Sequence, residues 1–151
     1  SFRKPRKILT MDRSLKIALI GYGRFGKKYF KEIKKLKKFD LAVVFVKNKI
    51  IKKCFAKFTA DKISKYNLDG AIIATPPNTH LVIAKEFLKK RIPIIIEKPA
   101  TLNFKSINIL NKLSTQNKTS VIINYSDLFN LNFLNLLKIY ENLQLFCAYW
   151  Y

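Results

Sequence analysis

The feature that most constrains this chain is an apolar segment, a glycine-rich loop and an amphipathic helix that follow one another without a break. Residues 16–20, KIALI, end at a glycine, which is typical of a buried strand. After the loop GYGRFG, residues 24–38 show the spacing of a helix. Its predicted sheet-facing residues are Phe25, Tyr29, Ile33 and Leu36. This arrangement predicts the first unit of a layered α/β domain.

Each glycine of the loop has a separate physical use. Gly21 allows a tight turn, Gly23 lets backbone N–H groups approach a pyrophosphate, and Gly26 lets the helix pack closely on the strand. The start of the helix offers N–H donors and partial positive charge, to which Arg24 and Lys27 add. The spacing G-x-G-x-x-G therefore favours a bound nucleotide, with a purely structural turn as the open alternative.

Strands and helices alternate along the rest of the chain. Apolar runs predict strands at residues 41–46, 71–74, 92–96 and 119–124. Helices are predicted at 79–90, 103–113 and 127–140, and a last strand at 143–151. Residues 50–66 fit a helix or a strand, and we assign them to a short helix. The predicted core-facing residues of the two middle helices are Leu81, Val82, Ile83, Ala84, Phe87 and Leu88, and Phe104, Ile107 and Leu110. The alternation predicts an α/β fold with a doubly wound parallel sheet.

The end of the second predicted strand bears on the choice of nucleotide. Dinucleotide folds that bind NAD usually place an acidic residue here, on the ribose hydroxyls. This chain instead has Lys47, Asn48 and Lys49. Positive charge at this point suits a 2′-phosphate, so NADP is slightly favoured over NAD. It is equally open that Lys47 and Lys49 only reflect the general lysine excess of the chain and bind nothing.

Two further motifs follow predicted strands, at the edge of the sheet where ligands lie in such folds. The first, ATPPNTH, offers Thr75, Pro76 and Asn78 to a ligand, and its His80 either caps the next helix or contacts the ligand. The second, EKPATLN, begins with Glu97 and Lys98. Lys98 could hold a substrate hydroxyl or assist proton transfer. An exposed ion pair of the two is the structural alternative.

The three motifs in this order resemble the Gfo/Idh/MocA oxidoreductases, the family of glucose-fructose oxidoreductase and inositol dehydrogenase. GYGRFG alone would also fit prephenate dehydrogenases or potassium-channel regulatory domains, but ATPPNTH followed by EKPATLN is more specific. The resemblance covers residues 15–130 and implies a Rossmann domain that binds NAD(P). The implied cofactor-binding residues are Gly21, Gly23, Arg24, Phe25, Gly26, Thr75, Pro76, Asn78 and His80.

The resemblance also implies roles for the EKP motif. Glu97 would lie near the nicotinamide, and Lys98 matches the family lysine that contacts cofactor and substrate. Lys98 is therefore the candidate catalytic residue, and the Lys98–Pro99 bond is a candidate for the cis form. The substrate class would be a sugar, cyclitol or sugar nucleotide.

The expected organisation is a basic tail at 1–13, the nucleotide-binding domain at 14–140 and the first strand of a second domain at 141–151. Family members carry their usual catalytic Asp and His in that second domain, and no histidine follows His80 here. Whether the chain is an enzyme by itself stays open. The alternative is a non-catalytic NAD(P)-binding module, as a truncated or decayed gene product or a sensor. The aromatic last strand would favour self-association, hence a homo-oligomer.

The charge and composition bear on other partners. The net charge of +21 attracts polyanions, but the lysines are scattered along the whole chain, so nucleic-acid binding is not expected as the main function. No apolar stretch reaches the roughly 20 residues that span a bilayer, so no membrane association is expected. Two distant cysteines, Cys54 and Cys147, and one histidine predict reduced thiols in the cytoplasm and no metal site.

Overall fold

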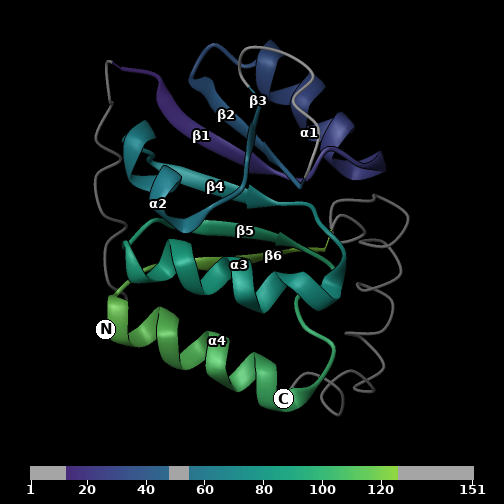
Figure 1. The fold of residues 1–151 in the computed structure, drawn as a ribbon, viewed down its shortest axis with the longest axis vertical. Helices are drawn as coiled ribbons and strands as arrows, with labels where there is room; N and C mark the ends of the chain where they lie inside the picture. Colours follow the sequence, from purple (N-terminus) through teal and green to yellow (C-terminus); the bar gives the residue numbers. More distant parts are fainter. Residues whose placement is uncertain (1–12, 48–54, 126–151) are drawn as a thin grey trace, which may run out of the picture.

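The sheet is parallel throughout the part of the chain that the computed structural model describes, residues 13–47 and 55–125. Its strands are β1 (Leu15–Ile20), β2 (Phe39–Val46), β3 (Phe55–Lys57), β4 (Gly70–Ile73), β5 (Ile94–Glu97) and β6 (Val121–Asn124). They lie in the order β3-β2-β1-β4-β5-β6 (Figure 1). The chain moves outward from β1 to β3, returns to β4 beside β1, and moves outward the other way to β6. The switch point between β1 and β4 is where open α/β sheets bind ligands.

Helices cover both faces of this sheet. On one face, α1 (Arg24–Lys35) packs Phe30 and Ile33 against a cluster that includes Leu19. On the other face lie α2 (Ala60–Ile63), α3 (Pro77–Lys89) and α4 (Phe104–Asn117), with α3 and α4 side by side (Figure 1). Because successive strand residues point to opposite faces, Leu19 joins the first cluster and Ile20 the second.

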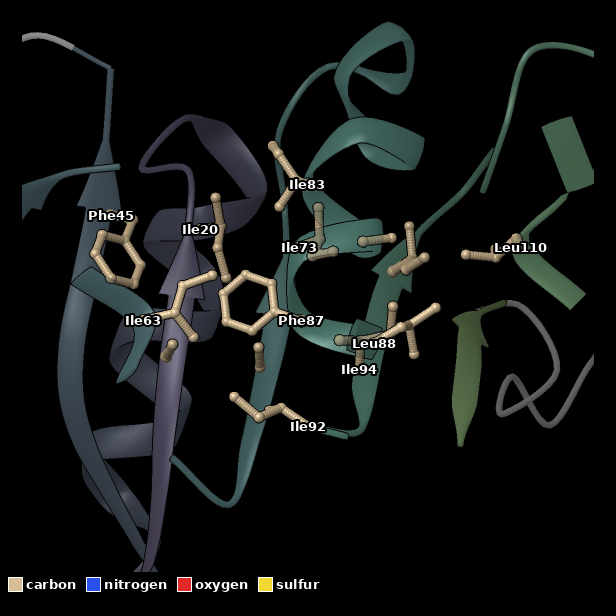
Figure 2. Close-up of a cluster of buried hydrophobic side chains, with 14 of the residues drawn as sticks. Ile20, Phe45, Ile63, Ile73, Ile83, Phe87, Leu88, Ile92, Ile94 and Leu110 are labelled. Atoms are coloured by element: carbon tan, nitrogen blue, oxygen red, sulfur yellow. The ribbon is translucent and has the colours of Figure 1, made fainter. Parts of the chain in front are cut away.

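The larger core lies between the sheet and α2, α3 and α4. Figure 2 shows Phe87 of α3 in the middle of it, with Ile20 and Ile63 to one side and Leu88 and Ile94 to the other. The Phe87 side chain is fully buried. This packing holds α3 on the sheet, and α3 begins at the carboxyl ends of the strands, where the predicted ligand-binding loops lie.

The predicted doubly wound parallel sheet is confirmed, with small shifts of the element ends. The second strand begins at Phe39 and not at residue 41, since β1 and β2 already pair at Leu15 and Phe39. The helix predicted over 24–38 therefore ends at Lys35. Asn103 caps α4 as predicted, because its side chain accepts a hydrogen bond from the Ser106 N–H at 2.9 Å.

The short helix assigned to residues 50–66 is wrong for part of its length. Phe55–Lys57 forms β3, and α2 and a 3-10 turn at Ser64–Tyr66 follow it. The aromatic ring of Phe55 packs edge-on against Tyr22, with the ring centres 4.8 Å apart. The pairing of β3 with β2 and this ring contact decide the strand conformation of Phe55–Lys57, because the segment has no clear helical spacing of its own.

Four of the predicted core-facing positions are also wrong. Phe25 and Leu36 are 47% and 50% exposed, and α1 buries Gly26, Phe30 and Ile33 instead. A Cβ on Gly26 would collide with the carbonyl oxygen of Gly21, so this glycine has to face the sheet and thereby sets the rotation of the helix. Val82 of α3 and Phe104 of α4 are likewise largely exposed.

Several predictions fall outside the described residues. They are the helix at 127–140, the strand at 143–151, the tail up to residue 12, and the positions of Asn48 and Lys49. Within residues 13–47 and 55–125, no helix has the length and apolar character needed to cross a bilayer.

Candidate functional site

A cavity of about 1120 Å³ opens at the carboxyl ends of β1, β2 and β4, beside the switch point of the sheet. Three loops line it, and they bring together predicted site residues that are distant in the sequence. These residues are Gly21, Gly23, Lys47, Thr75, Pro76 and Asn78. The apolar wall comes from Phe45, Phe58 and Ile83, among others. A mostly apolar cavity with a few converging polar groups is the usual form of a cofactor site.

Two of the loop glycines are required by the fold itself. Gly21 has a φ of +95°, and a Cβ there would lie 2.5 Å from the carbonyl oxygen of Ala74. Gly26 has no room for a Cβ against the Gly21 backbone, as described above. These glycines join β1, α1 and the loop after β4 tightly, which is what the sequence predicted for the turn and for the helix contact.

Gly23 differs from both, because the fold does not require it. A Cβ at this position would meet nothing within 4 Å, and its φ of −77° is open to any residue. Gly23 is the N-cap of α1, which has no side-chain capping hydrogen bond and no acidic residue in its first turn. The space above Gly23 therefore faces free N–H groups and the positive end of the helix. The site thus fits a phosphate-bearing ligand that comes close to the backbone.

The first turn of α1 carries two more predicted site residues. Arg24 and Phe25 are both exposed and do not line the cavity. Lys27 on the next turn places its Nζ 6.0 Å from the centre of the Tyr22 ring, which does line the cavity. The cationic side chains thus surround the start of the helix without filling the space in front of it.

His80 is fully buried behind the loop after β4 and joins two loops. Its Nε2 lies 2.7 Å from the carbonyl oxygen of Thr75, and its Nδ1 lies 3.0 Å from that of Pro99. Both partners are acceptors, so a neutral ring can donate to one of them and a doubly protonated ring to both. His80 therefore links the ATPPNTH loop to the EKP loop, and its side chain does not line the cavity.

The EKP motif lies at the carboxyl end of β5, on the far side of the switch point. Glu97 is only 7% exposed, and its Oε1 accepts hydrogen bonds from Tyr29 Oη at 2.5 Å and Asn124 Nδ2 at 2.8 Å. Burial and the hydrogen bond to Glu97 raise the pKa of the Tyr29 phenol. Lys98 is exposed directly beside this cluster, and the Lys98–Pro99 peptide bond is cis.

The structure adds residues to the site that the sequence alone did not indicate. Lys57 lines the cavity together with Lys47, because β3 pairs with β2 and sets Lys57 beside Val46. Thr79 also lines it, with its Oγ1 2.8 Å from Thr75 Oγ1 and 2.7 Å from the Pro76 carbonyl oxygen. The position of Thr79 within the ATPPNTH motif is a signal that could have identified it. Lys57 had no such signal while its segment was assigned to a helix.

The comparison with protein families agrees with this geometry. The family model of the Gfo/Idh/MocA proteins, described as an oxidoreductase family with an NAD-binding Rossmann fold, matches residues 15–125. A search of curated proteins gave no match.

Solved structures share the fold at low sequence identity. Scyllo-inositol dehydrogenase from Lactobacillus casei, with bound NAD(H) and scyllo-inositol, superposes with a TM-score of 0.75 at 18% identity. Myo-inositol 2-dehydrogenase from Lactobacillus plantarum gives a TM-score of 0.75 at 19% identity. In both cases the alignment covers 86% of this chain and 42% of the solved chain, so this chain spans less than half the length of these proteins.

Proposed function

Because this chain belongs to the Gfo/Idh/MocA oxidoreductase family and contains its NAD-binding Rossmann domain, we propose that it binds a nicotinamide dinucleotide for hydride transfer to or from a sugar-like substrate. The substrate class is a sugar, cyclitol or sugar nucleotide. The two inositol dehydrogenases with the same fold support this choice. The nicotinamide would supply or accept the hydride at a carbinol carbon of the substrate.

The observation that carries the proposal is the open space at Gly23. A glycine there is not needed for folding, and it leaves the start of α1 accessible from the cavity. The pyrophosphate would lie over this helix end, where the free N–H groups and the helix dipole favour negative charge. The adenosine half would extend over β2 and β3, and the nicotinamide half over β4 and β5, as the two halves of such a sheet each take one nucleotide.

We assign the other residues by their place along this path. Thr75, Pro76 and Asn78 form the cavity wall over β4, and His80 holds their loop from behind. Glu97 would lie at the nicotinamide end. Lys98 would contact cofactor and substrate, where its ammonium group can donate a hydrogen bond to the reacting hydroxyl.

We further propose that the cofactor is NADP in preference to NAD. Lys47 and Lys57 both line the cavity at the ends of β2 and β3, where the adenosine ribose would lie. The described wall of this cavity contains no acidic residue. A hydrogen bond between a lysine and a 2′-phosphate would contribute about 1.5 to 3 kcal/mol.

The cofactor preference can be tested with single charge reversals. Lys47→Asp and Lys57→Asp should each weaken NADPH more than NADH in a titration followed by nicotinamide fluorescence. Lys65→Asp makes the same charge change at an exposed position that does not line the cavity, and should affect both ligands little. A wild-type chain that prefers NADH would contradict the NADP proposal but not the dinucleotide proposal.

The proposed activity needs a separate test. Wild-type chain with bound cofactor is mixed with inositols and aldose sugars, and reduction of the nicotinamide is followed by absorbance. Binding without any reduction would favour the alternative of a non-catalytic NAD(P)-binding module. Failure to bind either dinucleotide would contradict the proposed function as a whole.

A further inference from the structure

Three side chains from separate elements meet at the carboxyl end of β5. Tyr29 comes from α1, Glu97 ends β5 and Asn124 ends β6. The Tyr29 hydroxyl and the Asn124 amide both donate to Glu97 Oε1, at 2.5 and 2.8 Å. The Asn124 Nδ2 also donates to Tyr29 Oη at 2.6 Å, so the three groups form a closed triangle.

The triangle holds a carboxylate in a defined orientation. An ionised carboxylate has about four acceptor positions, two on each oxygen. Within residues 13–47 and 55–125 both donors contact Oε1, and the acceptor positions of Oε2 can receive a donor from a ligand. A nearly buried carboxylate whose one oxygen is fixed in this way loses little rotamer freedom when its other oxygen accepts a further hydrogen bond.

None of the three side chains of the triangle lines the cavity. The cavity is bounded by the ends of β1, β2, β3 and β4, whereas Glu97 and Asn124 end β5 and β6. The helix that starts at the glycine loop carries Tyr29 on its second turn, so α1 connects the two regions. On the proposed path of the dinucleotide, only its nicotinamide nucleoside would reach the ends of β5 and β6.

We propose that Tyr29 and Asn124 are positioning residues that hold Glu97 Oε2 as the acceptor for the hydroxyl or amide donors of the nicotinamide nucleoside. The inference rests on the proposed dinucleotide binding and adds to it which residues fix the nicotinamide half. Tyr29 couples this half to the pyrophosphate loop, because α1, which carries the phenol, begins directly after that loop. Lys98 follows Glu97 directly, so the same contacts also restrict where the lysine can lie.

The test compares NADH with ADP, which lacks the whole nicotinamide nucleoside and keeps the adenosine and both phosphates. The wild-type chain, Tyr29→Phe and Asn124→Ala are titrated with both ligands by calorimetry. Each variant removes one donor to Glu97. We expect the dissociation constant for NADH to rise about fivefold or more and that for ADP to change less than about twofold. The fluorescence anisotropy of bound NADH should fall, since the ring would be held less firmly.

Tyr66→Phe is the matched control, because it removes a phenolic hydroxyl from the opposite face of the sheet, beside Phe45. It should leave the ratio of the two dissociation constants unchanged. If Tyr29→Phe and Asn124→Ala weaken both ligands equally, or neither, or if both variants fail to fold, the cluster is only structural and the inference is wrong. A wild-type chain that binds neither ligand would instead contradict the proposed function.

Discussion

Replacing Gly23 by valine should weaken dinucleotide binding about 100-fold and leave the fold intact. A Cβ at this position meets no atom within 4 Å, and the backbone angles suit an L-residue. The valine methyl groups would therefore occupy the open space in front of α1, where the pyrophosphate is proposed to lie. The loss of a glycine can even stabilise the folded state slightly, by about 0.4 to 1 kcal/mol, because the unfolded chain becomes less flexible.

The expected loss of affinity follows from the contacts that the valine would prevent. One hydrogen bond from a backbone N–H to a charged phosphate contributes about 1.5 to 3 kcal/mol. The favourable field of the helix end adds about 0.3 to 1 kcal/mol. A total near 3 kcal/mol corresponds to a roughly 100-fold higher dissociation constant. The assay is a titration with NADH and NADPH followed by nicotinamide fluorescence, together with thermal unfolding by circular dichroism.

Gly21→Ala is the matched control, because this glycine is required by the fold. Its alanine would have to adopt a φ of +95° and place a Cβ 2.5 Å from the Ala74 carbonyl oxygen. Strain and overpacking together should cost about 2 to 5 kcal/mol of stability. A Gly23→Val chain that binds both dinucleotides like wild type would refute the phosphate-site reasoning. A Gly23→Val chain that melts as early as Gly21→Ala would refute the distinction between the two glycines.

Three further predictions concern residues that hold the site and the fold in place. His80→Leu should weaken dinucleotide binding at least tenfold in the fluorescence titration, because leucine cannot donate a hydrogen bond to the carbonyl oxygen of Thr75 or Pro99 and the loop after β4 is then held less firmly. Unchanged affinity would contradict the role of His80 as a link between the two loops. Phe87→Ala should lower the free energy of unfolding by about 3 to 5 kcal/mol in urea, because the ring is fully buried; a loss below about 1 kcal/mol would mean that the core is not packed as described. The hydrogen bonds from Arg13 and from the Lys16 N–H hold the pKa of Asp69 below its usual value. Asp69 therefore stabilises the fold at pH values above its unfolded-state pKa, and this stabilisation is lost as the pH falls through the lower folded-state pKa. Asp69→Asn should therefore cost about 1 kcal/mol at neutral pH for this partly exposed pair, and a difference from wild type that persists at pH values well below 3.9 would contradict the linkage.

The sequence by itself determined the fold class and the three loops that form the edge of the site. A continuous apolar run indicates a buried strand, and apolar residues at helical spacing indicate a helix. Both patterns are local, so the order of strands and helices could be predicted. The glycine loop was predictable for the same reason, because Gly21 and Gly26 are required by the local backbone geometry where β1 leads into α1. The placement of ATPPNTH and EKPATLN after strands followed from this order alone.

Only the tertiary structure decided which faces and which distant residues meet. The rotation of α1 depends on how closely Gly26 approaches the Gly21 backbone, and this turned Phe25 outward. Lys57 joined Lys47 because a short segment without its own period paired with β2. The contact of Tyr29 with Asn124 spans 95 positions in the sequence. Local periodicity carries no information about such contacts, because sheet order and the packing of helices on the sheet bring these residues together.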